Sequence, residues 1–85
     1  MKETEEIDPR IKAIGRKLRK LRLETGSKNY EHFAFDHDLS RVQYHRIEKG
    51  TNFTITYFLK ILDIHKLTLT EFFSDLDEYQ KENND

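Results

Sequence analysis

The sequence predicts an all-α domain of five short helices. Apolar side chains recur every three or four residues in successive segments, and residues that favour helix caps stand between those segments. No segment makes a convincing strand, and 85 residues suffice for one domain with a single small core. We expect this domain to span residues 9–77. An acidic segment, 1–8, precedes it and an acidic tail, 78–85, follows it, and both lack the apolar content needed to order themselves.

The composition excludes several classes of site. The chain has no cysteine, so it can form neither disulfides nor thiolate metal sites. No apolar run approaches the length of a membrane span, and the first residues lack the apolar core of a secretory signal. We therefore expect a soluble cytoplasmic protein.

The net charge of −1 is the average of an uneven distribution. Residues 9–74 carry thirteen Lys or Arg against seven acids, whereas residues 1–8 and 75–85 are both acidic. A basic body between acidic ends is typical of a domain that binds a nucleic-acid duplex and has solvated tails. Short acidic ends that merely aid solubility would give the same distribution.

The first helix is expected to begin at Pro9, because the N–H that proline lacks is not needed in a first turn. Four apolar residues follow at helical spacing, namely Ile11, Ile14, Leu18 and Leu21. Gly26 suits the left-handed backbone at the end of this helix.

The second and third helices are short and are joined by a tight turn. Asn29 is the expected N-cap of the second helix, and Ser40 is that of the third. The third helix runs from Arg41 to about Lys49 and ends at Gly50. Its inward-facing residues would be Tyr44, Ile47 and Glu48.

Two further helices complete the predicted domain. Thr54 caps the fourth, whose apolar stripe is expected to comprise Ile55, Phe58, Leu59 and Leu62. The fifth begins near Thr68 or Thr70, and its stripe is expected to comprise Leu69, Phe72, Phe73 and Leu76.

The pattern from Gly15 to Phe73 resembles the phage-repressor and Cro-like (xenobiotic-response-element type) helix-turn-helix family of regulators. The matching residues are Ile14-Gly15, Leu18, Leu21-Arg22, Phe33-Ala34, Leu39-Ser40, Tyr44, Ile47-Glu48, Gly50, Leu59, Ile61, Leu67 and Glu71-Phe72-Phe73. The resemblance implies a lambda-repressor-like DNA-binding domain in which the second and third helices form the helix-turn-helix. It also implies a partly buried ion pair between Arg22 and Glu48. Asp38 stands where the family usually has Gly, and is expected to adopt a positive φ.

The outer face of the third helix carries long hydrogen-bonding side chains, and such a helix can lie in the major groove. By resemblance, Arg41, Val42 and Arg46 occupy positions that contact bases. Gln43 and His45 lie alongside, nearer the sugar–phosphate backbone, and complete the candidate base-contact set. On an isolated surface helix the same arginines would be ordinary solvated charges.

Phosphate contacts are expected from the flanks of the third helix, because positioning and base recognition are usually divided between different groups. On one side, Asn29 and the first N–H groups of the second helix can donate to a phosphate, and Tyr30 adds a hydroxyl. On the other side, the candidates are Lys49, Thr51 and Asn52.

The four histidines do not form a metal motif. His32 and His37 are five residues apart, unlike the spacing in a zinc-binding helix. By resemblance, His65 occupies an apolar core position, so we expect a partly buried, hydrogen-bonded imidazole. The sequence has no nucleophile-and-base arrangement and no phosphate-binding glycine loop. We therefore expect no metal, no cofactor, no small-molecule substrate and no enzymatic activity.

The apolar residues near the end of the chain indicate a homodimer. Phe72, Phe73, Leu76 and Tyr79 form a stripe richer than a small core needs, and members of the family commonly dimerise through this end. A dimer would place two recognition helices about 34 Å apart on an inverted repeat. In the alternative, all four side chains pack within the monomer.

The function indicated is sequence-specific binding of double-stranded DNA by a transcriptional regulator. Repression by occupancy of an operator is the simplest mechanism. An antitoxin that binds a toxin, or another protein partner, would also fit. The remaining alternative is a protein-interaction module that retains the fold without binding DNA.

Overall fold

This computed structural model describes residues 7–81, and this range contains six helices. They are α1 (Pro9–Glu24), α2 (Tyr30–Asp36), α3 (Arg41–Lys49), α4 (Ile55–His65), α5 (Leu69–Phe73) and α6 (Leu76–Lys81). No strand occurs in this range, so the all-α prediction is confirmed, although six helices replace the expected five. Between residues 7 and 81, no helix is long and apolar enough to cross a membrane.

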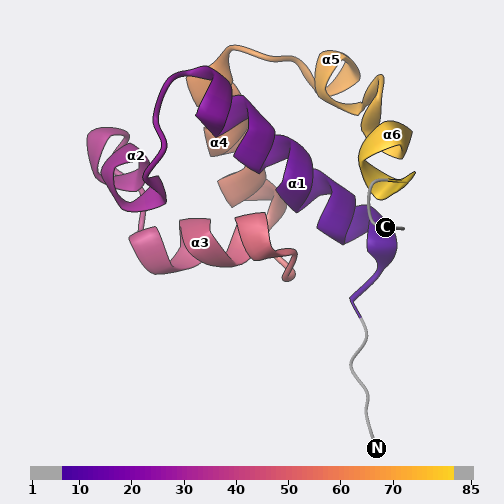
Figure 1. Ribbon diagram of the computed structural model, residues 1–85, viewed down its shortest axis with the longest axis horizontal. Helices are drawn as coiled ribbons and strands as arrows, with labels where there is room; N and C mark the ends of the chain where they lie inside the picture. Colours follow the sequence, from indigo (N-terminus) through magenta and orange to yellow (C-terminus); the bar gives the residue numbers. More distant parts are fainter. Residues whose placement is uncertain (1–6, 82–85) are drawn as a thin grey trace, which may run out of the picture.

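The longest helix, α1, runs through the molecule, and the other helices surround it (Figure 1). α3 and α6 both pack against α1, and α2 packs against α3. The start of α1 lies beside α6 at one end of the molecule, whereas α2 lies at the other end (Figure 1).

Capping side chains determine where the helices begin. Asn29, Ser40 and Thr54 each accept a hydrogen bond from a backbone N–H in the first turn of the following helix, as predicted. Thr68 caps α5 in the same way, and the carboxylate of Glu71 accepts from the Thr68 N–H at 2.9 Å. These contacts are local in sequence, which explains why the helix starts could be predicted.

Ordered structure continues beyond residues 9–77 at both ends. The carboxylate of Asp8 caps α1 by accepting from the N–H of Arg10 at 2.8 Å, so Asp8 belongs to the folded domain. At the other end, α6 continues to Lys81 and buries the ring of Tyr79, so ordered structure extends past residue 77. The rest of the two predicted tails, residues 1–6 and 82–85, lies outside the described residues.

Two basic side chains of α1 hold the C-terminal helices. Lys17 is buried, and its ammonium donates to the Phe72 carbonyl and to the Asp75 carboxylate, both at 2.6 Å. Arg16 donates to the Tyr79 carbonyl at 3.0 Å. Because Lys17 bonds the Phe72 carbonyl, that oxygen does not need a helical N–H partner, and the chain can turn between α5 and α6. The predicted fifth helix is therefore two helices.

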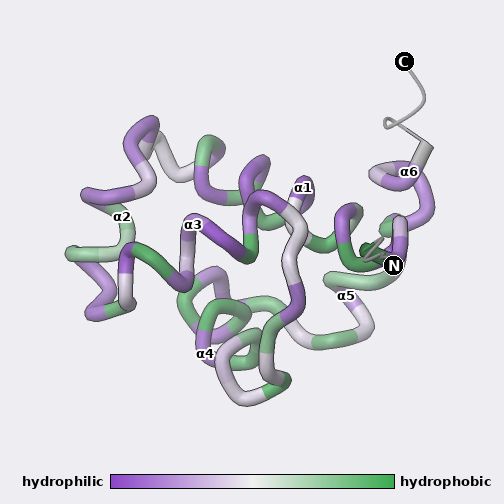
Figure 2. The backbone as a smooth tube through the Cα atoms, turned by 90° about the horizontal axis from the view of Figure 1, so that it is seen from below, coloured by the Kyte–Doolittle hydropathy of each residue, from purple (hydrophilic) through white to green (hydrophobic). Residues whose placement is uncertain are grey.

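The core comprises Leu18, Phe33, Ala34, Leu39, Tyr44, Ile47, Phe58, Ile61, Leu62 and Phe72. The predicted stripe of α4 is partly wrong, because Ile55 is 66% exposed and Leu59 is also exposed, whereas Ile61 is fully buried. Apolar residues occur on most sides of α4 (Figure 2), so their spacing alone does not identify the buried side.

Gly15 allows α1 to approach the end of α3 closely. A Cβ atom at this position would lie 2.8 Å from the carbonyl oxygen of Glu48 and closer still to that of Ile47. Only a residue without a side chain fits there, so Gly15 helps to set the position of α3 against α1.

Candidate nucleic-acid interface

The helices α2 and α3 are joined by a short turn, an arrangement compatible with a helix-turn-helix. Asp38 adopts a φ of 59° in the turn, as predicted for this position. The N–H of Leu39 donates to the Ala34 carbonyl at 2.8 Å, and Ala34 is completely buried. The small side chain of Ala34 and the Ser40 cap together fix the direction in which α3 leaves the turn.

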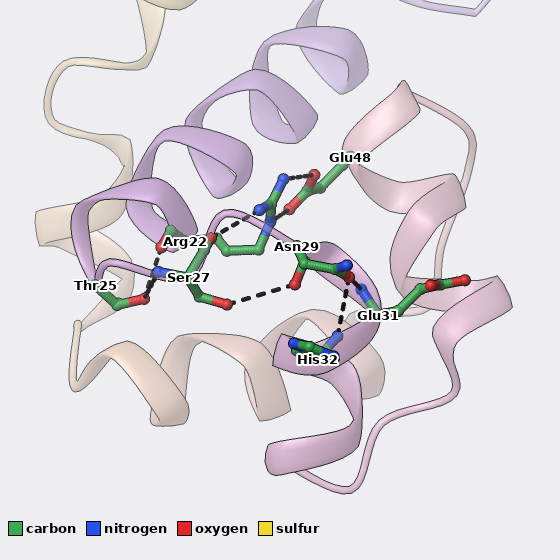
Figure 3. Close-up of polar contacts among 7 residues, drawn as sticks. All are labelled: Arg22, Thr25, Ser27, Asn29, Glu31, His32 and Glu48. Carbon is green, nitrogen blue, oxygen red and sulfur yellow. Dashed lines mark hydrogen bonds and ion pairs between the residues drawn. The ribbon is translucent and has the colours of Figure 1, made fainter.

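A buried ion pair fixes α3 to α1. The Arg22 guanidinium donates twice to the Glu48 carboxylate, at 2.8 Å from Nε and 3.0 Å from Nη2 (Figure 3). The two side chains are only 5% and 6% exposed. Arg22 also donates to the Ser27 carbonyl at 2.8 Å, and its hydrogen bonds to Glu48 raise the pKa of the guanidinium. The pair implied by the resemblance is present. Through its bond to Ser27, Arg22 also fixes the loop before α2.

The outer side of α3 is open to solvent. Arg41, Val42, Gln43 and Arg46 are exposed, while Tyr44 and Ile47 on the opposite side are buried. Both arginines therefore lie on the surface where the sequence predicted base contacts. The structure thus presents a short, anchored helix with a basic outer face.

Two of the candidate side chains on this face already contact α2. Arg41 Nη1 lies 3.4 Å from Oε2 of Glu31. The ring of His45 is half-buried and stacks on that of Tyr30, with centroids 4.4 Å apart and planes at 23°. Neither contact was predictable from the sequence pattern, because each joins two helices.

At the start of α2, where a phosphate contact was predicted, two backbone N–H groups already have a partner. Oδ1 of Asn29 accepts from the backbone N–H groups of Glu31 and His32 at 2.7 and 3.1 Å (Figure 3). Those two N–H groups are therefore satisfied within the protein. The amide nitrogen of Asn29 and the hydroxyl of Tyr30 remain candidates for a phosphate contact.

On the other flank, Lys49 and Asn52 are exposed and Thr51 is half-buried. The Thr51 hydroxyl donates to the Arg46 carbonyl at 2.9 Å, which helps to end α3. Lys49 and Asn52 therefore remain the more accessible candidates for contact with a DNA backbone.

A hollow of about 380 Å³ lies beside α3 and includes residues from both candidate sets. Its lining comprises Gln43, Arg46, Asn52, Phe53, Thr54 and Tyr57. Burial raises the pKa of the Tyr57 phenol to about 12, so this ring stays neutral. The aromatic lining was not predicted, although Phe53 in an otherwise polar loop was a signal for it.

His65 is half-buried, as expected, but it is not hydrogen-bonded through Nε2. Its ring stacks on that of Phe33, with centroids 5.7 Å apart. Burial lowers the pKa of His65, and the charge of the nearby His37 lowers it further. Within the described part of the chain, no three His, Asp or Glu side chains come together to form a possible metal site.

The predicted dimer surface is mostly internal. Phe72 and Tyr79 are buried, and Leu76 packs partly buried against the core, so these three belong largely to the monomer. Phe73 is 43% exposed. Three further apolar residues of α4 and α5 are also exposed, namely Ile55, Leu59 and Leu69.

The sequence is similar to that of a known protein. The two are 40% identical over 66 residues, which cover 76% of this chain and 89% of the relative. The relative is described as control protein C.MunI, from Mycoplasma sp. No family model and no solved structure match the chain.

Proposed function

We propose, since this chain belongs to the same family as control protein C.MunI, that it is a sequence-specific DNA-binding regulator of transcription. The observation that carries this proposal is the outer face of α3, where Arg41 and Arg46 are exposed on a helix anchored by the Arg22–Glu48 pair. The proposed mode of binding is insertion of α3 into the major groove of double-stranded DNA. The proposal assigns the chain no catalytic step, and a regulator of this kind would act in the cytoplasm.

The arginines, Gln43 and Val42 on this face each have a chemical role in the proposed binding. Arginine can pair bidentately with guanine, glutamine with adenine, and the Val42 side chain can contact a thymine methyl group. Lys49 and Asn52 would hold the flanking backbone, as would Asn29 and Tyr30 on the other flank. Occupancy of an operator that overlaps a promoter would exclude the polymerase, so we propose repression as the output.

The proposal includes a homodimer formed through α4 and α5. Four exposed apolar residues lie on these helices, and the rings of Phe58 and Phe73, 5.8 Å apart, join the two. A second copy that covered this surface would bury side chains that are costly to leave in water. Its two α3 helices would then face half-sites about one duplex turn apart.

Selection of binding sites from a random duplex pool tests the function directly. The expected result is a preferred sequence arranged as an inverted repeat, whose half-site spacing reports the dimer geometry. Recovery of no preferred sequence would contradict specific recognition.

Salt dependence separates a DNA-binding protein from a protein-interaction module or a toxin-binding antitoxin without DNA affinity. Affinity should fall steeply as salt rises, because each phosphate contact releases counterions. Fluorescence anisotropy with a labelled duplex measures this slope. An interaction module would bind no duplex even at low salt and high protein concentration.

A further inference from the structure

Two side-chain contacts join α2 to the outer side of α3. Near the start of α3, Arg41 Nη1 lies 3.4 Å from a carboxylate oxygen of Glu31. One turn further along, the ring of His45 stacks on that of Tyr30. The first contact is open to solvent, since the side chains of Arg41 and Glu31 are 66% and 50% exposed. α2 therefore restrains two side chains that the proposed function places against DNA.

An arginine on a DNA-binding surface has two competing uses. Its guanidinium can pair with guanine in the major groove, which gives specificity. It can instead bind a phosphate, which adds affinity for every duplex regardless of sequence. A long side chain held by no neighbour can reach either target, so its surroundings decide which use prevails.

We infer that Glu31 is a specificity-determining residue, which favours base contact by Arg41 over phosphate contact. The carboxylate accepts from one side of the guanidinium and so restricts its orientation. Its negative charge also repels nearby phosphates, and this repulsion opposes binding to any duplex in which no base contact compensates for it. The inference rests on the proposed function, because it concerns the same surface.

The test compares wild-type protein with Glu31→Gln on two duplexes of equal length. One carries the tightest sequence from the pool selection, and the other is random. Gln keeps nearly the shape of Glu but has no charge. Affinity for the random duplex should rise about two- to fivefold at low salt, and affinity for the selected site should rise less or fall. The ratio of the two affinities should therefore decrease.

The salt slope gives a second readout that a purely structural role would not change. In Glu31→Gln, binding to the random duplex should weaken more steeply with salt, because Arg41 makes an additional phosphate contact. In an Arg41→Ala background, the same change at Glu31 should no longer alter the affinity ratio. Thermal unfolding of each variant verifies that α2 remains folded, since Glu31 also lies in its first turn.

Glu24→Gln is the matched control. Glu24 is similarly exposed and pairs with Lys20 at 4.0 Å on α1, so this variant removes the same charge without removing the partner of Arg41. Its affinity ratio should equal that of wild type. An equal loss of discrimination in Glu24→Gln would attribute the effect to net charge and overturn the inference.

Two other outcomes are decisive and distinguishable. If the wild-type protein discriminates between the duplexes and Glu31→Gln does so equally well, the inference fails while the proposed function stands. If the wild-type protein binds no duplex at low salt, the proposed function fails and the inference fails with it.

Discussion

Arg41 and Arg46 are exposed on the same helix, and each is proposed to contact a base. Replacement of either by Ala should weaken binding to the selected site more than to a random duplex, by about 1–3 kcal/mol, because a bidentate base contact is lost. Fluorescence anisotropy on the two duplexes measures the difference. Lys49→Ala is the comparison, because loss of a phosphate contact should weaken both complexes alike. If the arginine variants lose affinity equally for both duplexes, Arg41 and Arg46 contact phosphates rather than bases.

Protonation of His65 should destabilise the fold. Burial against Phe33 and the charge of His37 lower the pKa of His65 from the usual 6.5, although the charge of Glu24 opposes this shift. The neutral form is therefore favoured in the folded state. Its contribution to stability is complete above the unfolded-state pKa and is lost as the pH falls through the lowered pKa.

Urea unfolding at about pH 8 and about pH 5.5 measures this loss. For His65→Leu, the free energy of unfolding should differ less between the two pH values than it does for wild type. His32→Gln, a change at an exposed position, should show the same difference as wild type. The same pH dependence in His65→Leu and wild type would assign the effect to other groups.

Single residues were predictable where their role depends on nearby backbone or on a pairing implied by the resemblance. Asp38 has its positive φ, and Arg22 pairs with Glu48. Lys17 was not predictable as a buried residue, because its partners, Phe72 on α5 and Asp75 in the turn before α6, lie 55 and 58 residues away in the chain. The orphaned Nε2 of His65 likewise depends on packing that no local pattern reveals.

At the scale of helices, the close contact between α1 and α3 predicts how adding one methyl group at Gly15 changes the free energy of unfolding. Helix propensity alone would make Gly15→Ala stabilising by about 0.5–1 kcal/mol. The added Cβ would overlap the carbonyl oxygens of Ile47 and Glu48, so we expect a net destabilisation of about 1–3 kcal/mol instead.

Chemical denaturation measures this change in the free energy of unfolding. Arg19→Ala, at an exposed position of the same helix, is the control and should change stability little. A Gly15→Ala protein more stable than wild type would show that α3 can move away from α1 without cost.

Helix starts were predictable because each cap is made by a side chain within three residues of the N–H that it accepts from. The buried side of α4 was not, since the helix has apolar residues on most sides and the contacts with its neighbours select Phe58, Ile61 and Leu62. The division of the last helix was also missed, because Lys17 of α1 supplies the hydrogen bond that ends α5.

For the whole molecule, the exposed apolar residues of α4 and α5 predict self-association. Ile55→Glu should shift the sedimentation coefficient towards that of a monomer and weaken binding to a two-half-site duplex, because it places a charge in the proposed interface. The monomer itself should stay folded, as its circular dichroism spectrum would show, since Ile55 is 66% exposed in it. Thr56→Glu adds the same charge at the neighbouring exposed position and is the control. Identical sedimentation of Ile55→Glu and wild type would exclude this surface as the interface.

The burial of the Arg22–Glu48 pair has a practical consequence for handling the protein. Dissolved ions reach exposed charges readily but screen buried pairs much less. A concentrated salt wash should therefore strip nucleic acid from α3 while the internal guanidinium–carboxylate link stays closed. Elution from a heparin column should then yield protein with an unaltered circular dichroism spectrum.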